Sequence, residues 1–329
     1  MIGILGAGAW GTALAQVVAG DGTPVRLWAR EPEVAQAIAT TGANPLFLPG
    51  IALSGRISAT SRLADMAGCA PLLLVVPAQF LAAVLAEAPL GDRPPLILCS
   101  KGIEAGTGRL MSDVAADAVP GAEIAVLSGP SFAADVARGL PTAVTLAAAP
   151  LARAEALCAL LARPAFRPYA SDDIIGAEVG GAVKNVLAIA CGVVMGAGLG
   201  ESARAALIAR GFAEMTRFAV ALGARAETLA GLSGLGDLVL TCGSPQSRNM
   251  ALGMALGQGR SAAEALRGRN SVAEGAATAP ILVARARALG VEMPIAEAVD
   301  DLLAGRGSAG ECVTRLLTRP LRPESHSPG

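Results

Sequence analysis

Lysine is almost absent from this chain of 329 residues. Of its 26 basic residues only Lys101 and Lys184 are lysine, and the remaining 24 are arginine. Arginine keeps its proton at all ordinary pH values, whereas lysine can release one. A chain that otherwise uses arginine therefore has a reason to keep lysine where a proton is transferred. Composition alone leaves the alternative open, in which both lysines lie by chance on a solvated surface.

Histidine is scarcer still, because the single histidine is His326, close to the C-terminus. Nucleophilic Ser-His and Cys-His schemes are therefore excluded, and so are dehydrogenases that use imidazole as their acid or base. The six cysteines form no C-x-x-C pair and sit in a chain too large to need disulfide bonds. We expect reduced core thiols in a cytoplasmic protein, no metal site, and lysine as the acid-base residue.

A net charge of -1 and only 3% aromatic residues make nucleic acid an improbable partner. The mean hydropathy of +0.54 suggests a membrane protein, and residues 66–86 run without a charge for about the length of a bilayer span. Pro71 and Pro77 divide that run into a buried strand and a following helix, so we expect no stable membrane insertion.

A glycine-rich turn follows the first apolar strand, residues 1–5. The turn Gly6-Ala-Gly-Ala-Trp-Gly11 leads into a helix predicted over residues 12–19, and a second strand follows at 25–29. G-x-G-x-x-G in this context is typical of dinucleotide binding, because the glycines allow close approach to a pyrophosphate that the helix N-terminus attracts. The expected contacts in this turn are Gly6, Gly8, Ala9, Trp10 and Gly11.

Arg30 stands where NAD-preferring sites commonly place an acidic residue, just after the second strand. Its guanidinium can bind a 2′-phosphate, which favours NADPH, while the neighbouring Glu31 keeps NADH possible. The alternative is that Arg30 is a surface cation.

The pattern of predicted elements changes along the chain, from strands with intervening helices to helices alone. Further strands are predicted at 56–60, 72–76, 96–99, 124–127, 142–146 and 166–169, with a helix at 78–86. Beyond residue 171 only helices are predicted, at 172–195, 202–222, near 228, and at 248–256, 261–266, 273–289 and 295–303. We expect an α/β N-terminal Rossmann domain with a mostly parallel sheet over 1–171, an all-α C-terminal domain over 172–320, and a disordered tail over 321–329.

Candidate site residues lie in both predicted domains. Lys101 directly follows a strand, at the sheet edge where ligands bind. Gly180 and Gly181 precede Lys184 by one turn and allow another backbone or a ligand to approach closely. We expect Lys184 to be the proton donor and Asp237 to orient it, although Asp237 could instead be a helix cap.

Ser247, Arg248 and Asn249 combine a plausible N-cap with a guanidinium and an amide, which suits a phosphate. The alternative for Arg248 is packing against acidic neighbours.

Several segments together resemble the bacterial-type NAD(P)-dependent glycerol-3-phosphate dehydrogenases over nearly the whole chain. They are Gly6-Ala-Gly-Ala-Trp-Gly-Thr-Ala13, Leu48-Pro-Gly50, Val76-Pro77, Lys101-Gly102, Leu127-Ser-Gly-Pro-Ser-Phe-Ala133, residues 178–185, Ala203-Arg-Ala-Ala-Leu207, Gly231-Leu-Ser-Gly-Leu-Gly-Asp237 and Ser247-Arg-Asn249. The resemblance implies reduction of dihydroxyacetone phosphate to sn-glycerol 3-phosphate for glycerophospholipid synthesis, with NADPH preferred, NADH possible, and a homodimer.

Residue roles follow from the same resemblance. The implied cofactor contacts outside the glycine-rich turn are Arg30, Lys101, Ala133, Arg248, Val272 and Glu274. The implied substrate contacts are Lys101, Gly129, Ser131, Lys184, Asn185, Asp237, Ser247, Arg248 and Asn249, with Lys184 as the acid and base. The chain departs from many relatives at Ala9, Phe47, Met195 and Ser202.

Two other functions stay open at this point. One is a related 3-hydroxy acid or phosphogluconate dehydrogenase, and the other is a non-catalytic NADPH-sensing protein, which would have no reason to keep Lys184.

Overall fold

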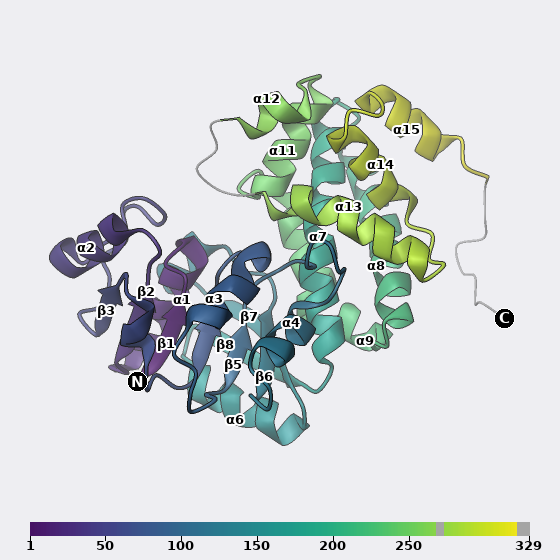
Figure 1. The fold of residues 1–329 in the computed structure, drawn as a ribbon. Helices are drawn as coiled ribbons and strands as arrows, with labels where there is room; N and C mark the ends of the chain where they lie inside the picture. The colour runs from purple at the N-terminus through teal and green to yellow at the C-terminus, as the bar shows by residue number, and fades with distance from the viewer. Residues whose placement is uncertain (268–272, 321–329) are drawn as a thin grey trace.

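The computed structural model of the protein describes residues 1–267 and 273–320 (Figure 1). They form an open sheet covered by helices, followed by helices packed around one central helix. The predicted cofactor contact Val272 and the predicted tail 321–329 lie outside the described residues.

One eight-stranded sheet occupies the N-terminal half. Its strands are β1 (Ile2–Leu5), β2 (Val25–Trp28), β3 (Ile57–Thr60), β4 (Leu72–Leu74), β5 (Leu96–Leu98), β6 (Ile124–Ser128), β7 (Thr142–Ala148) and β8 (Phe166–Ser171). Their spatial order is β3-β2-β1-β4-β5-β6-β7-β8, and only the β6–β7 pair is antiparallel. The mostly parallel sheet is confirmed, with small shifts at the strand ends. The order reverses between β1 and β4, where open α/β sheets bind their ligands.

Helices cover both faces of this sheet. They are α1 (Ala9–Val18), α2 (Pro32–Thr41), α3 (Leu81–Glu87), α4 (Met111–Ala118), α5 (Ala133–Ala137) and α6 (Leu151–Leu161). Successive strand residues face opposite layers: Ile4 packs in one core with Leu14 of α1, and Leu5 packs in the other with Leu81 of α3. The prediction missed α2, α4, α5 and α6. It also began α1 too late, because Gly8 is an extended N-cap and the helix already starts at Ala9.

The second half is helical, as predicted. It contains α7 (Ile174–Gly196), α8 (Glu201–Ala221), α9 (Ala226–Leu229), α10 (Asp237–Gly243), α11 (Arg248–Gly257), α12 (Ala262–Leu266), α13 (Glu274–Ala288), α14 (Pro294–Leu303) and α15 (Ala309–Leu317). A π-helical turn, Leu232–Gly236, leads directly into α10. The prediction missed α10 and α15.

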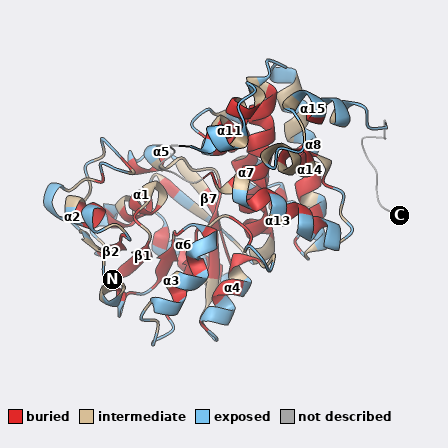
Figure 2. Cartoon of the chain, turned by 45° about the horizontal axis from the view of Figure 1, so that its top comes forward, coloured by how far each residue is buried: buried red, intermediate tan, exposed pale blue. Residues whose placement is uncertain are grey.

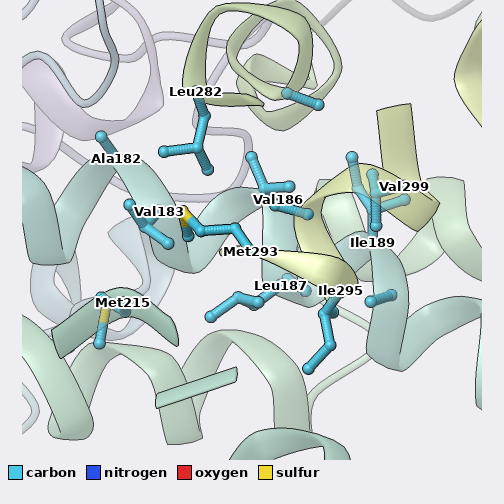
Figure 3. Close-up of a cluster of buried hydrophobic side chains, with 14 of the residues drawn as sticks. Ala182, Val183, Val186, Leu187, Ile189, Met215, Leu282, Met293, Ile295 and Val299 are labelled. Atoms are coloured by element: carbon cyan, nitrogen blue, oxygen red, sulfur yellow. The ribbon is translucent and has the colours of Figure 1, made fainter. Parts of the chain in front are cut away.

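Helix α7 is the core of this half (Figure 2). Val183, Val186 and Leu187 of α7 belong to one buried cluster with Met215 of α8 and Leu282 of α13 (Figure 3). By length and hydropathy α7 could cross a membrane, yet 89% of its apolar window is buried inside the protein. Helix α7 therefore has the burial of a core helix in a soluble fold, and it carries Lys184 in its middle.

Candidate active site

The glycine-rich turn forms a cradle between β1 and α1. Gly6 has a φ of +116°, and a Cβ there would lie 2.7 Å from the carbonyl oxygen of Val75. A Cβ at Gly11 would lie 1.8 Å from the carbonyl oxygen of Gly6, so only glycine fits either position. At Gly8 a Cβ would meet nothing within 4 Å, and no side chain caps the helix start. Open space in front of the N-terminus of α1 fits a dinucleotide pyrophosphate.

Other predicted cofactor residues lie around this cradle. Trp10 is half-buried, and its indole Nε1 has no hydrogen-bond partner within the described part of the chain. Ala133 begins α5, which packs against α1. Arg30 follows β2 with its side chain 71% exposed, and its Nη2 contacts Glu31 Oε1 at 2.7 Å. The guanidinium is thus accessible but is already paired with the residue that would oppose a 2′-phosphate.

Two lysine side chains, one from each half of the chain, meet at the carboxylate of Asp237. Lys184 Nζ donates to Asp237 Oδ1 at 2.5 Å, and Lys101 Nζ donates to Asp237 Oδ2 at 2.7 Å. Lys184 also donates to Thr241 Oγ1 at 3.0 Å. Asp237 is only 1% exposed, so this carboxylate is a buried counter-ion shared by two ammonium groups rather than a solvated helix cap. Sequence analysis had left both possibilities open.

Burial sets the protonation behaviour of this cluster. Desolvation lowers the pKa of Lys184 to about 8; the carboxylate of Asp237 opposes that shift and the charge of Lys101 adds to it. Burial alone would raise the pKa of Asp237, but the two ammonium groups outweigh it and hold that pKa below its usual value. Asp237 therefore stays ionised while Lys184 titrates close to neutral pH.

Glycines bring α7 into contact with both neighbouring segments. A Cβ at Gly180 would lie 2.4 Å from the carbonyl oxygen of Ser233, in the turn before Asp237. A Cβ at Gly181 would lie 2.8 Å from Ser128 Oγ and 3.4 Å from Lys101 Cγ. The expected close approach of another backbone is found at Gly180, whereas Gly181 is approached by the side chains of Ser128 and Lys101.

The loop after β6 lies against the same cluster. Gly129 has a φ of +153°, its carbonyl oxygen accepts from Lys101 Nζ at 3.5 Å, and the same oxygen accepts from Ser131 Oγ at 3.1 Å. Glu274, at the start of α13, is half-buried, and burial raises the pKa of its carboxyl group against the opposing positive charge of Arg248 and both lysines.

Ser247 caps α11 as predicted, accepting from Met250 N at 3.3 Å. Arg248 is the next residue, and it is close enough to Glu274 for their charges to interact. Asn249 is buried and donates from Nδ2 to Asn185 Oδ1 at 3.0 Å. The structure therefore brings Lys101, Lys184, Asp237 and Gly129 together and joins Asn249 to Asn185 on α7. Ser247 bonds within its own helix end.

Comparison with known proteins places nearly the whole chain in one family. The models for the N-terminus and the C-terminus of NAD-dependent glycerol-3-phosphate dehydrogenase match residues 1–154 and 173–314. Two relatives, from Erythrobacter litoralis and Caulobacter vibrioides, are named glycerol-3-phosphate dehydrogenase (NAD(P)+). Each is 60% identical over 326 residues, covering 99% and 98% of this chain and 98% of each relative. The chain belongs to the NAD-dependent glycerol-3-phosphate dehydrogenase family.

Solved structures of glycerol-3-phosphate dehydrogenases share the fold. The crystal structure from Coxiella burnetii has a TM-score of 0.91 and 39% identity, covering 97% of this chain and 98% of that one. The enzyme from Saccharomyces cerevisiae has a TM-score of 0.81 and 26% identity, covering 95% and 98%.

Sequence analysis missed Thr241, the second hydrogen-bond acceptor for Lys184. A usable signal existed, because Thr241 follows Asp237 by four residues and so shares its face of a helix. That signal needed α10, which had not been predicted. The contact between Asn185 and Asn249 was also missed, since it depends on how α7 and α11 pack.

Proposed function

We propose that this chain catalyses the reversible reduction of dihydroxyacetone phosphate to sn-glycerol 3-phosphate, the backbone precursor of glycerophospholipids. The observation that carries the proposal is the buried Lys184 ammonium, held by Asp237 and Thr241 and joined through Asp237 to Lys101, which follows β5 at the carboxyl edge of the sheet. A titratable donor beside a nicotinamide site is what ketone reduction requires.

The cofactor site suits NAD(P)H. Gly6, Gly8 and Gly11 provide the pyrophosphate cradle, with Trp10 and Ala133 beside it. Arg30 is the residue that would bind a 2′-phosphate, which supports a preference for NADPH. When bound, the reduced nicotinamide supplies a hydride to the ketone carbon.

Lys184 handles the proton. Two of its three N–H bonds point to Asp237 and Thr241, so the ammonium group is fixed while the third N–H donates to the carbonyl oxygen that becomes the alcohol. In the reverse direction the neutral amine accepts the alcohol proton. A pKa of about 8 lets Lys184 perform both roles near neutral pH.

The charge balance of the cluster favours a phosphorylated substrate. One carboxylate, Asp237, is shared by Lys101 and Lys184, which leaves one positive charge in excess. Arg248 and the N-terminus of α11 lie near the same cluster, where burial raises the pKa of the neighbouring Glu274 carboxyl group and so disfavours its negative charge. We therefore assign the phosphate group to this side of the site. Lys101, Gly129 and Ser131 complete the substrate contacts from the sheet side.

Three further points are part of the proposal. The polypeptide divides between Ser171 and Asp172 into a dinucleotide-binding and a helical domain, which is supported by the end of β8 at Ser171 and the start of α7 at Ile174. The enzyme acts as a homodimer in the cytoplasm, as the resemblance to its family suggests.

The test is to follow NADPH and NADH oxidation with dihydroxyacetone phosphate, using unphosphorylated dihydroxyacetone as control. We expect turnover with the phosphorylated substrate and little without the phosphate.

Arg248→Ala should reduce kcat/KM strongly for dihydroxyacetone phosphate and hardly for dihydroxyacetone, since only the phosphorylated substrate has a phosphate to lose. An equal loss for both would make Arg248 structural and point to Lys101. No turnover of the parent would leave the hydroxy acid and NADPH-sensing alternatives.

A further inference from the structure

One buried amide side chain holds the glycine-rich turn from inside the protein. Asn44 is fully buried, and its Nδ2 donates to the carbonyl oxygen of Ala7 at 2.9 Å and to Thr12 Oγ1 at 2.9 Å. The hydroxyl of Thr12, which is fully buried as well, donates to the same carbonyl oxygen at 3.2 Å. Two side chains therefore hold the Ala7 carbonyl, which lies in the turn between β1 and α1.

The backbone around Asn44 fixes the orientation of its amide. Asn44 Oδ1 accepts from Phe47 N at 3.1 Å. A backbone N–H can only donate and a backbone carbonyl can only accept, so the amide oxygen must face Phe47 and the amino group must face Ala7. If the amide turned over, two oxygens would face each other at Ala7 and two N–H groups at Phe47. Asn44 is thus a fixed hydrogen-bond donor to the glycine-rich turn.

The hydrogen bonds to the Ala7 carbonyl also set the direction of the Gly8 N–H. In a planar trans peptide the carbonyl and the following N–H point to opposite sides, so the Gly8 N–H points away from Asn44 and Thr12. Within residues 1–267 and 273–320 this N–H makes no hydrogen bond, and a Cβ added at Gly8 would meet nothing within 4 Å. The N–H is therefore directed away from the buried side chains and remains for a ligand.

The Ala7–Gly8 peptide needs such a restraint because of the glycine. Backbone hydrogen bonds hold the peptides on either side, since Gly6 N donates to Trp28 O at 3.0 Å and Thr12 N donates to Gly8 O at 3.0 Å. Turning over the peptide between them changes ψ of Ala7 and φ of Gly8, and glycine adopts positive φ at little cost. The turned peptide would direct the Ala7 oxygen toward a bound pyrophosphate and repel its negative charge.

We propose that Asn44 is a positioning residue of the cofactor site, which fixes the Ala7–Gly8 peptide so that its N–H faces the pyrophosphate of NADH or NADPH. Asn44 acts through the backbone and needs no contact with the cofactor. Both cofactors carry the same pyrophosphate, so Asn44 supports the binding of both alike. The inference concerns cofactor binding alone and does not depend on which ketone the enzyme reduces.

Ligand binding without turnover tests this role. Asn44→Ala removes the donor to the Ala7 carbonyl, and the dissociation constants for NADH, NADPH and ADP-ribose should rise by a common factor of at least about ten. ADP-ribose carries the pyrophosphate but no nicotinamide, so it reports on the glycine-rich turn separately. Fluorescence titration measures the two reduced cofactors and calorimetry measures ADP-ribose. Unchanged binding of ADP-ribose would overturn the role of Asn44, and so would a loss limited to NADPH.

Gln16→Ala is the matched control. Gln16 Oε1 accepts from Ser54 N at 2.8 Å, so this side chain also holds the segment after α2 on α1, but it does not contact the glycine-rich turn. The control should leave all three dissociation constants nearly unchanged. An equal loss in Asn44→Ala and Gln16→Ala would mean that both variants act through that segment, and would exclude a specific effect on the Ala7–Gly8 peptide.

Thr12→Val is the milder variant in case Asn44→Ala fails to fold. It removes only the hydroxyl that donates to the Ala7 carbonyl and accepts from Asn44. All three ligands should again lose affinity by a common factor, smaller than in Asn44→Ala, and parent affinity for all three would overturn the inference. With dihydroxyacetone phosphate, both variants should raise KM for NADH and keep kcat at saturating NADH. A parent that binds NADH without turnover would contradict the proposed reaction and leave the binding test intact.

Discussion

Lys184 is the residue on which the proposed chemistry depends. Lys184→Arg keeps a positive charge beside Asp237 but cannot release a proton. We expect kcat to fall by roughly 10²–10⁴-fold while the affinity for NADPH stays within twofold of the parent. Steady-state kinetics and NADPH fluorescence titration measure the two effects. Activity within tenfold of the parent would rule out Lys184 as the acid.

The pKa of Lys184 predicts opposite pH profiles for the two directions. Because burial lowers this pKa to about 8, the ammonium form that reduction needs is lost above that pH, and kcat for reduction should fall about tenfold per unit there. Oxidation of glycerol 3-phosphate needs the neutral amine, so its kcat should rise up to about pH 8 and then level off. Profiles measured in both directions with saturating substrates check this. Two profiles that bend in the same direction would contradict it.

Arg30 and Glu31 should together set cofactor choice. Arg30→Ala should raise the KM for NADPH about tenfold and leave NADH nearly unchanged, because only NADPH carries the 2′-phosphate. Glu31→Gln is the matched variant: it releases Arg30 from its 2.7 Å ion pair and removes a negative charge, so NADPH should bind more tightly. Equal changes for both cofactors would show that this pair does not read the 2′-phosphate.

At the scale of single residues, the sequence identified the charged residues of the site but not which of them contact one another. Lys184 stood out because lysine is so rare, and Asp237 because it ends one of the segments that resemble the family. That Lys101 would share the same carboxylate depends on how the sheet meets α10, and no local pattern carries that information. The same holds for Asn249, whose partner Asn185 lies on another helix.

At the scale of elements, α7 depends on backbone contact with its neighbours. Gly180→Ala places a methyl group 2.4 Å from the carbonyl oxygen of Ser233, so the turn before Asp237 must move away. We expect about 1–3 kcal/mol lower stability in chemical denaturation, and a kcat loss larger than this destabilisation explains, because Asp237 shifts relative to Lys184. Gly243→Ala is the control, since a Cβ there meets nothing within 4 Å. Equal losses of stability and of kcat in Gly180→Ala and Gly243→Ala would contradict the proposed contact.

Strands were easier to predict than helices for a physical reason. The central strands are buried on both faces and read as short apolar runs, as in Leu72–Leu74. Missed helices such as α6, with the sequence LARAEALCALL, are rich in alanine and leucine and show little contrast between their faces. Their existence follows instead from the need for a crossover between parallel strands. Helix α10 was missed because it begins inside a glycine-rich turn.

At the scale of the whole molecule, Glu178 connects α7 to the layer of helices on the sheet. Its Oε1 accepts from Ser112 N at 2.9 Å, at the first turn of α4. Burial raises the pKa of Glu178 to about 7, although the bonds from Ser112 oppose that shift. Glu214 of α8 makes a similar link within the helical half, because it accepts a hydrogen bond from Ile295 N at the start of α14. Burial raises the pKa of Glu214 to about 7 as well.

The raised pKa of Glu178 makes stability depend on pH in a definite direction. The unfolded carboxyl has a pKa of 4.5 and the folded one about 7, so between these values the folded state binds more protons. The free energy of unfolding therefore falls as the pH rises through this window, by about 3 kcal/mol from this group. Glu178→Gln cannot ionise, yet its oxygen still accepts from Ser112 N. We expect the variant to lose the contribution of Glu178 to the pH dependence of the free energy of unfolding, while the contribution of Glu214 stays. Denaturant unfolding from about pH 5 to about pH 8 measures both slopes.

Exposed Glu87→Gln serves as control and should keep the parent slope. If Glu178→Gln and Glu87→Gln kept the same slope, Glu178 would be ionised throughout and its burial would be offset by partners other than Ser112.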